Sequence, residues 1–420
     1  IAVTHSIPDA VSAAITTPYG TVVHTADFKL DPTPLDNRLS DLNRFAEWGD
    51  KGVLLFICDV TNVYRPGMVD SERTVGVRFA QIMEKAKGRV LVASFASHLH
   101  RLQQAIEVGA RYGRRTALIG RSMLKNVATA LQTGHLPIDP GLLIPIEKID
   151  QYPDNEVLVL MTGSQGEPGS GMTRIATGNH HHMTIKDTDV VIISAQPIPG
   201  NEANISRAVN KMFERGANVY YGPNAGVHVS GHANRGEIKL LMNMVKAQNV
   251  MPYHGENRHF REFRELAMKM GYARNNVVVG GIGDIMQFDS KGLIRTLPNP
   301  HAGVVLIDGA LGEEYGSKLL EERKELAEGG VVIVSLVLDK DTNVLTSFSI
   351  ESKGFLLAKN ADGLFEQAEV ILTESVIALI NDAGQPEIEK IEARIRNKLQ
   401  KLFQKKIQRK PLIIPIIHQV

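Results

Sequence analysis

The chain has 420 residues, 43% hydrophobic and 22% charged, which is enough for two or three domains with cores of their own and typical of a globular protein. It contains one cysteine, Cys58, which excludes an internal disulfide and a cysteine-rich zinc module and favours a reduced, cytoplasmic protein. The formal net charge is +1, so any nucleic-acid binding must come from a local basic surface. We expect no membrane association, because no apolar run is long enough to cross a bilayer.

The N-terminal part of the chain alternates short apolar runs with turns. Residues 12–28 predict two strands joined by a turn, residues 38–48 predict a helix, and residues 53–58 predict a buried strand. The sequence starts with Ile1 inside an apparent strand, without Met and without the pattern of a signal peptide. We therefore expect that the natural N-terminus lies further upstream.

Strands and helices alternate from about residue 70 to residue 220. The expected strands are continuous apolar runs, at 89–95, 116–119, 157–162, 190–194 and 218–221. Continuous apolar strands between helices are typical of a parallel sheet that is covered on both faces. Two further helices, over 235–247 and 257–271, flank a short strand at 250–253.

The last part of the chain predicts a separate small domain. Residues 290–327 are irregular and contain Pro298 and Pro300, which is typical of a linker. Residues 330–420 predict a hairpin, two helices and a final strand, and so an α/β domain with its own core.

Four residues with metal-binding side chains share one feature of the predicted structure. Asp27, Asp59, His232 and His254 each lie at or just past an apolar strand, or beside a tight glycine turn. Such positions gather at one edge of a sheet, and carboxylate and imidazole together suit zinc or manganese. Each residue alone is more simply interpreted as a cap, a turn or a core residue. Taken together, the four favour a metal site.

The sequence resembles the ribonuclease J family, which belongs to the metallo-β-lactamase superfamily and carries an inserted β-CASP domain. The resemblance covers essentially the whole chain and is carried by eight segments in order: His5–Asp9, Thr25–Lys29, Asp59–Gly67, Phe95–Arg101, Thr162–Pro168, Ser194–Glu202, His228–His232 and His254–Glu256. It implies an α/β fold: a metallo-β-lactamase αββα sandwich with an inserted β-CASP α/β domain and a small C-terminal α/β domain.

The resemblance also implies domain boundaries. The metallo-β-lactamase domain is split around the insert, and the expected ranges are 1–68 and 222–290 for its two parts, 69–221 for the β-CASP domain, 291–329 for a linker and 330–420 for the C-terminal domain.

The resemblance implies a role for each candidate site residue. His5, Asp27 and His254 match metal ligands, and His232 and Asp59 match catalytic residues, His232 as a general acid and Asp59 as the acid that orients the site. The residues that match RNA phosphate contacts are Ser97, His98, His228, Ser230, Gly231 and again His232. The implied cofactor is two Zn²⁺ per subunit, with Mn²⁺ or Mg²⁺ as alternatives.

The implied function is metal-dependent hydrolysis of RNA phosphodiesters, as a 5′–3′ exonuclease with endonuclease activity, in rRNA and mRNA maturation and decay. The implied partners are single-stranded RNA with a 5′-monophosphate and other subunits, in a homodimer or homotetramer, or with a paralogous subunit or an RNA-decay complex. An alternative is a catalytically inactive paralogue that binds RNA or acts as a scaffold.

One departure from the family bears on this choice. The family's His-x-His-x-Asp-His motif, expected upstream of His5, has no equivalent in the sequence. Either the sequence begins downstream of that motif or the chain is a degenerate copy, and the start inside a strand favours the first. We expect weak or no binding of two metal ions and little activity from the sequence as it stands.

A basic run follows Glu392 and lies in a predicted amphipathic helix. A docked helix with a solvated basic face is the simpler interpretation, and an RNA-contacting or subunit-contacting face is the alternative.

Overall fold

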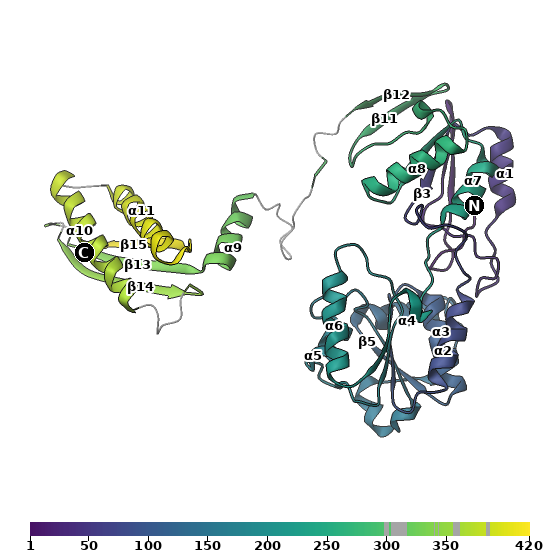
Figure 1. The fold of residues 1–420 in the computed structure, drawn as a ribbon, viewed down its shortest axis with the longest axis horizontal. Coiled ribbons are helices and arrows are strands. Elements are labelled where there is room, and N and C mark those ends of the chain that lie inside the picture. The colour runs from purple at the N-terminus through teal and green to yellow at the C-terminus, as the bar shows by residue number, and fades with distance from the viewer. Residues whose placement is uncertain (298–301, 304–316, 340, 343, 356–361, 384–386) are drawn as a thin grey trace. The chain divides into compact units, whose positions relative to one another are not determined.

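The computed structural model describes residues 1–297, 302–303, 317–339, 341–342, 344–355, 362–383 and 387–420 (Figure 1). The chain forms two compact units, Ile1–Ala302 (unit 1) and Gly303–Val420 (unit 2). Among the described helices, none has both the length and the apolar character needed to cross a bilayer.

The first part of unit 1 is built on a four-stranded sheet with the order β1-β2-β3-β10. Its strands are β1 (Ala13–Thr17), β2 (Gly20–His24), β3 (Leu55–Asp59) and β10 (Asn249–Tyr253). β1 and β2 form an antiparallel hairpin, whereas β2, β3 and β10 are parallel to one another. The helices are α1 (Leu42–Lys51), α7 (Arg235–Val245) and α8 (Asn257–Lys269).

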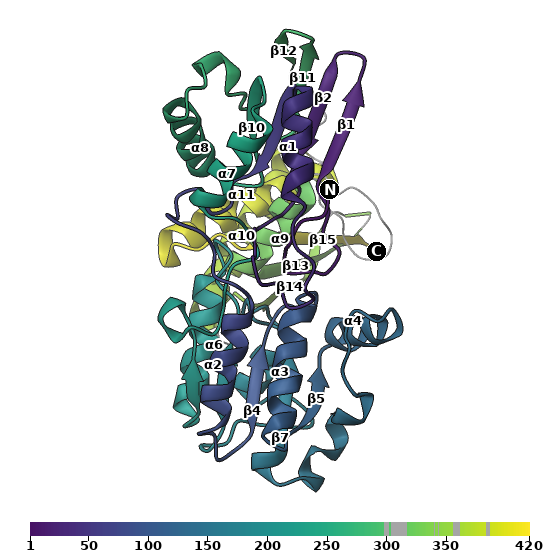
Figure 2. The ribbon, with the colours of Figure 1, turned by 90° about the vertical axis from the view of Figure 1, so that its right-hand side faces the viewer.

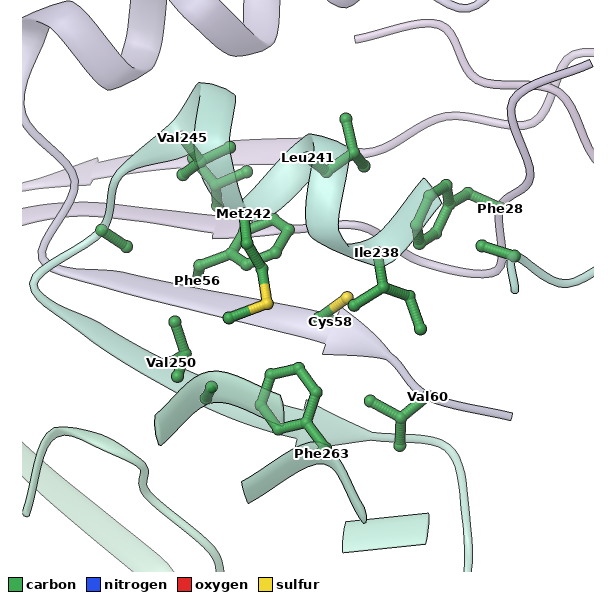
Figure 3. Close-up of a cluster of buried hydrophobic side chains, with 14 of the residues drawn as sticks. Phe28, Phe56, Cys58, Val60, Ile238, Leu241, Met242, Val245, Val250 and Phe263 are labelled. Atoms are coloured by element: carbon green, nitrogen blue, oxygen red, sulfur yellow. The ribbon is translucent and has the colours of Figure 1, made fainter. Parts of the chain in front are cut away.

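These helices cover one face of the sheet. Phe56 and Cys58 alternate along β3 and therefore point to the same face, where Leu241 of α7 and Phe263 of α8 pack in one buried cluster (Figure 3). Phe45 of α1 joins the same cluster. This part of the chain thus shows one helix layer and one sheet layer of the expected αββα sandwich.

The second part of unit 1 is a six-stranded sheet with the order β6-β5-β7-β4-β8-β9, in which every pairing is parallel. Its strands are β4 (Val90–Ala93), β5 (Arg115–Ile119), β6 (Leu143–Ile144), β7 (Val157–Met161), β8 (Val190–Ile193) and β9 (Asn218–Tyr220). Its helices are α2 (Arg73–Met83), α3 (Leu99–Arg111), α4 (Arg121–Gln132), α5 (Gly171–Thr177) and α6 (Glu202–Glu214).

Helices cover both faces of this sheet, as the apolar strands predicted. Along β7, Leu158 and Leu160 pack with α2, α3 and α4, while Val159 and Met161 pack with α5 and α6. The helices α2 and α3 contact each other and run side by side along the sheet (Figure 2). The mixed α/β fold with parallel sheets is confirmed.

Unit 1 also contains a hairpin and several short helical turns. The hairpin pairs β11 (Ile285–Asp289) with β12 (Gly292–Leu297). The 3₁₀ turns are η1 (Pro140–Leu142), η2 (Ile146–Gln151), η3 (Asp154–Glu156), η4 (Pro223–Ala225) and η5 (Arg274–Asn276).

The six-stranded part is inserted between two neighbouring strands of the first sheet. The chain leaves the first sheet after β3 and returns before α7, where Asn234 forms a parallel bridge with Asn62, and β3 and β10 pair in parallel from Leu55↔Asn249 to Asp59↔Tyr253. The ends of the insertion therefore lie next to each other at the carboxyl edge of the first sheet.

Unit 2 has a three-stranded sheet with the order β14-β13-β15. Its elements are α9 (Ser317–Gly329), β13 (Val331–Leu338), β14 (Leu345–Lys353), α10 (Asp362–Ala383), α11 (Ile388–Ile407) and β15 (Leu412–Gln419). Strands of this sheet and the helices α10 and α11 share one buried cluster, which includes Leu372 and Leu399. Pro415 lies in β15, where an edge strand tolerates a residue without an N–H.

The hairpin, two helices and final strand predicted for residues 330–420 are all present. The range expected as a linker, 291–329, contains β12 and α9, and residues 298–301 and 304–316 of it lie outside the described residues. The domain boundaries stay a prediction.

Candidate metal centre and cleft

The carboxyl edge of the first sheet brings together residues that are far apart in the sequence. The strands β2, β3 and β10 are parallel, so Asp27, Asp59 and His254 come to the same edge. His232 reaches this edge from the turn before α7. One ligand atom from each of these four residues lies within 4.8 Å of the other three.

Asp59 is held by a set of short hydrogen bonds. Its Oδ1 accepts from the backbone N–H of Thr61 at 2.9 Å and from the Thr61 hydroxyl at 2.7 Å. Its Oδ2 accepts from Nδ1 of His232 at 2.7 Å. The carboxylate is buried, and these bonds hold its orientation and engage only Nδ1 of His232 and not Nε2.

Asp27 and His254 form a second pair. His254 Nδ1 donates to Asp27 Oδ1 at 3.0 Å, and the Tyr253 hydroxyl lies 3.4 Å from the same oxygen. The hydrogen bond from His254 lowers the pKa of Asp27 to about 2, and the same bond raises the pKa of His254. Asp27 is therefore ionised at neutral pH, and its negative charge would attract a metal cation.

His5 lies beside this cluster with a fixed tautomer. Its Nδ1 is 2.8 Å from the carbonyl oxygen of Gly231, which can only accept, so Nδ1 carries the proton. Its Nε2 then has a free lone pair and lies 3.9 Å from Asp27 Oδ2. A carbonyl that orients a histidine in this way is common behind a metal ligand. The three expected metal ligands are thus neighbours.

The donor set fits a divalent metal ion. Carboxylate oxygens and imidazole nitrogens are the ligands that zinc takes beside thiolates, and the four clustered residues supply two of each. Two carboxylate groups this close to each other are stabilised by a cation between them. Asp27 and His254, with His5 beside them, are therefore the residues that would hold a metal, and Asp59 and His232 adjoin them as a hydrogen-bonded pair.

The turn 228–232 closes the site from the other side. The Asn62 side-chain amide donates to the Ser230 hydroxyl at 2.8 Å and to the His232 carbonyl at 2.9 Å. A Cβ on Gly231 would lie 2.1 Å from the Ser6 hydroxyl and 2.9 Å from the His5 ring. Only glycine fits at this close approach of the turn to His5.

A cleft of about 630 Å³ adjoins the cluster, and its lining includes His232 and His254 but not His5, Asp27 or Asp59. The predicted site residues that line it are His98, His228, Ser230, Gly231, His232 and His254. Ser97 does not line this cleft: it is exposed on a neighbouring groove of about 380 Å³, together with Lys125 and His135.

Two of the predicted phosphate-contacting histidines are held neutral by the protein. Burial lowers the pKa of His98 to about 4, and its ring lies 3.5 Å from Glu72. Burial, together with nearby Arg101, lowers the pKa of His228 well below its usual value. Both rings face the cleft as uncharged groups.

Sequence reasoning missed several residues of the cleft. Arg65, Gln196 and Arg258 line it, and Glu72 and Arg101 lie behind it. The sequence does contain one sign of Arg101. It lies among the apolar residues of a predicted amphipathic helix, and a cation buried there needs an acidic partner.

Comparisons with known proteins agree with this geometry. Residues 87–212 match the model of the ribonuclease J β-CASP domain, residues 224–279 match that of the Zn-dependent metallo-hydrolase RNA specificity domain, and residues 318–420 match that of the ribonuclease J C-terminal domain. The chain is 38% identical over 415 residues to ribonuclease J of Thermus thermophilus, an alignment that covers 99% of this chain and 70% of the relative.

The chain belongs to the ribonuclease J family. Ribonuclease J of Helicobacter pylori is 36% identical over 100% of this chain and 60% of its own length, and ribonuclease J2 of Bacillus subtilis is 34% identical over 99% of this chain and 75% of its own length. The chain thus spans about 60 to 75% of the length of these relatives. The resemblance found in the sequence is confirmed, and family membership gives the enzyme class, a metal-dependent ribonuclease.

Proposed function

We propose that the protein hydrolyses RNA phosphodiesters, as a 5′–3′ exonuclease with endonuclease activity, in rRNA and mRNA maturation and decay. The observation that carries this proposal is the cluster of Asp27, Asp59, His232 and His254, whose two histidines line the cleft. The ribonuclease names of its relatives support RNA as the substrate. We assign two Zn²⁺ ions as the cofactor, with Mn²⁺ or Mg²⁺ as substitutes.

We assign different steps of the reaction to different side chains of the site. The metal, when bound, supplies Lewis acidity that activates water and offsets charge on the phosphate. Asp59 holds the ring of His232 at 2.7 Å, and His232 donates a proton to the leaving 3′ oxygen. Ser230 and the backbone N–H of Gly231 donate to the phosphate oxygens, where negative charge grows during the reaction.

We further propose that the RNA is single-stranded and that a 5′-monophosphate is preferred. A cleft lined by hydroxyl and neutral imidazole groups supports this choice, because the exposed phosphates of an unpaired strand can accept hydrogen bonds from them. His98, His228 and Ser230 are the expected contacts within the cleft. Ser97 is an expected contact from the adjoining groove.

The test combines metal content with RNA cleavage. We expect a protein that carries the family's His-x-His-x-Asp-His motif upstream of this sequence, reconstituted with zinc, to bind metal in proportion to protein and to release nucleotides from a 5′-monophosphorylated RNA, and this sequence alone to do both weakly. An Asp27→Asn variant should lose both, and an Asp289→Asn variant, changed in a surface hairpin, should keep both. Metal binding without cleavage would contradict the hydrolase assignment. RNA binding with neither metal nor cleavage would favour the alternative, an inactive RNA-binding or scaffolding subunit.

We also propose that the protein forms a homodimer or homotetramer through unit 2. Strand β15 is an edge strand of its sheet, and the exposed side chains of Ile414 and Ile416 lie on it. An exposed apolar edge strand favours pairing with another chain. Light scattering during size-exclusion chromatography should give a multiple of 46.1 kDa, and the pair Ile414→Lys and Ile416→Lys should reduce it to the monomer mass. A wild-type monomer at micromolar concentration would contradict this proposal.

We propose a cytoplasmic location, and the basis is that the single cysteine is a buried free thiol. Cys58 is buried, and burial raises its pKa well above the usual value, so it remains a protonated thiol in a reducing compartment. Cell fractionation of the natural host tests this location directly, and recovery outside the cytoplasmic fraction would contradict it.

A further inference from the structure

A buried ion pair lies behind the cleft. Arg101 of α3 is fully buried and contacts both carboxylate oxygens of Glu72, Nε to Oε1 at 2.8 Å and Nη2 to Oε2 at 2.7 Å. The pair lies inside the β-CASP part, where an ion is retained only if its partners satisfy it. Glu72 neutralises the guanidinium, so Arg101 adds no net charge to the cleft.

The remaining donors of Arg101 point at the segments that carry cleft residues. Nη1 donates to the carbonyl and hydroxyl of Ser194, at 3.0 and 3.2 Å, and Nη2 donates to the carbonyl of Val229 at 3.1 Å. Nη1 also lies 2.5 Å from Nδ1 of His228. One side chain of the insert thus holds the turn 228–232 at two adjacent residues.

The contact with His228 fixes the tautomer of that ring. A guanidinium has donors and no acceptor, so Nδ1 of His228 must accept from Arg101. The carbonyl of Ser194 also lies near the ring and could accept a second hydrogen bond, but Nη1 approaches Nδ1 to 2.5 Å, where a proton on Nδ1 would face another donor. A neutral ring that accepts at Nδ1 carries its proton on Nε2. Arg101 contacts the ring at Nδ1 and not at Nε2, and His228 lines the cleft.

We propose that Arg101 is a positioning residue that locks His228 in its neutral Nε2–H tautomer and directs that N–H into the cleft as a donor to an RNA phosphate oxygen. The phosphate part of this inference rests on the proposed function, whereas the tautomer part does not. In this hydrogen-bond network the Glu72 carboxylate orients the Arg101 guanidinium, and the guanidinium orients the His228 ring. The ring then presents an uncharged donor to the cleft.

The first experiment reads the tautomer without RNA or metal. In the full chain labelled with ¹⁵N-histidine, long-range ¹⁵N–¹H NMR spectra report which ring nitrogen carries the proton, and a His228→Gln variant assigns the signal. We expect the Nε2–H form at neutral pH. The double variant Glu72→Gln with Arg101→Met removes donor and charge together and should release His228 to a mixture of tautomers. A wild-type Nδ1–H form, or an unchanged tautomer in the double variant, would overturn the proposal.

A matched buried pair controls for loss of stability. Arg89 contacts both oxygens of buried Asp189, at 2.9 and 2.6 Å, at the opposite edge of the same sheet. The double variant Arg89→Met with Asp189→Asn should destabilise the fold similarly and leave the His228 tautomer unchanged. An equal change of the tautomer in both double variants would show a general structural effect and overturn the specific role of Arg101.

The second experiment measures affinity for a 5′-monophosphorylated oligonucleotide in the presence of a chelator. Glutamine can place its amide nitrogen near the position of Nε2, and asparagine can place it near Nδ1. We therefore expect His228→Gln to stay within about 3-fold of wild type, and His228→Asn and the Glu72/Arg101 double variant to bind about 5- to 10-fold more weakly, the loss of one hydrogen bond. Equal affinities of the two His228 variants would contradict the Nε2 donor. No RNA binding by the wild type would contradict the proposed function itself, and the tautomer would still decide the role of Arg101.

Discussion

His254 is a candidate metal ligand and also has a backbone conformation typical of a turn. It has a φ of 59°, in the left-handed region, and its carbonyl accepts from the Thr61 hydroxyl at 3.1 Å. Among residues with a side chain, asparagine tolerates this conformation best, whereas alanine there costs about 1–2 kcal/mol.

We expect His254→Asn to lower zinc affinity by at least about 10-fold and to abolish RNA cleavage, with little change in stability, because the side chain is half exposed. Zinc titration and thermal denaturation measure the two effects. His181→Asn, on an exposed loop, is the control and should change neither. Retained cleavage in His254→Asn would remove His254 from the metal site.

Gly231 sets how closely the 228–232 turn approaches His5. We expect Gly231→Ala to destabilise the protein by about 1–3 kcal/mol, because the new methyl group would overlap the Ser6 hydroxyl and contact the His5 ring. Chemical denaturation measures the loss. Gly113→Ala is a useful contrast, since it has a φ of 74° but nothing within 4 Å of a Cβ, and it should show only the backbone cost. Equal losses would mean that the contact with His5 is not limiting.

At the residue scale, the sequence predicted the members of the site better than their arrangement. Asp27, Asp59, His232 and His254 were recognisable because each follows an apolar strand or adjoins a glycine turn. The hydrogen bond between Asp59 and His232 was not predictable, because 173 residues separate them and the contact depends on the β3–β10 pairing. Ser97 resembled a cleft residue by motif alone, and the turn before α3 places it on the neighbouring groove.

At the scale of elements, α7 begins at a junction of three chain segments. Glu237 is fully buried and its carboxylate accepts from the backbone N–H groups of Leu30 at 2.8 Å, Val69 at 3.0 Å and Asn234 at 2.8 Å. The last of these bonds is half of a capping box at the start of α7. The same side chain thus joins both parts of the split lactamase sequence and the entry to the insert.

We expect Glu237→Gln to destabilise unit 1 by about 1.5–3 kcal/mol, because the amide turns one acceptor into a donor that faces a backbone N–H. Urea denaturation followed by circular dichroism measures this loss. Glu262→Gln is the control, because its carboxylate is half exposed in a surface pair with Arg235 and should contribute less than about 1 kcal/mol. A loss for Glu237→Gln no larger than that of the control would show that the junction does not depend on the charge.

The α2–α3 interface should be sensitive to acid. The folded-state pKa of His98 is about 4, lower than its ordinary value of 6.5, so the unfolded chain binds more protons between these values. The stability from neutral His98 is complete above about pH 6.5 and is lost as the pH falls toward 4, by roughly 3 kcal/mol at the limit. His228 should act in the same direction. Glu72, whose pKa is lowered by Arg101, adds a further loss only below about pH 4.5.

Free energies of unfolding measured between pH 4 and pH 8 test this expectation. His98→Gln should flatten the slope between pH 4 and pH 6.5, and His181→Gln should leave it unchanged. A slope in His98→Gln equal to that of wild type would assign the acid sensitivity to other groups.

For the whole molecule, the separate cores predict separate unfolding. The clusters of unit 1 and the cluster that contains Leu372 and Leu399 share no residue. We expect residues 303–420, expressed alone, to unfold cooperatively with a midpoint within a few degrees of the corresponding transition in the full chain. Calorimetry of the fragment and of the full chain makes the comparison, and a fragment without a cooperative transition would show that unit 2 depends on unit 1.

Much of the architecture followed from local pattern. Strands β4, β7 and β8 are continuous apolar runs, and the structure buries them between two helix layers as expected. The strand order β6-β5-β7-β4-β8-β9 could not be derived in this way, because pairing between parallel strands depends on long connections rather than on local turns. The domain ranges came from the resemblance for the same reason.

The pairing of β3 with β10 has a consequence for the protein while it is being made. Asp59 is synthesised 195 residues before His254, which at ordinary translation rates is about 10 to 40 s. For the first 173 residues of that interval the growing chain has neither His232 nor His254, and for the rest it still lacks His254, so the cluster of four residues is incomplete throughout. The messenger RNA that is being read is therefore beside an unfinished nuclease until the whole insert has left the ribosome.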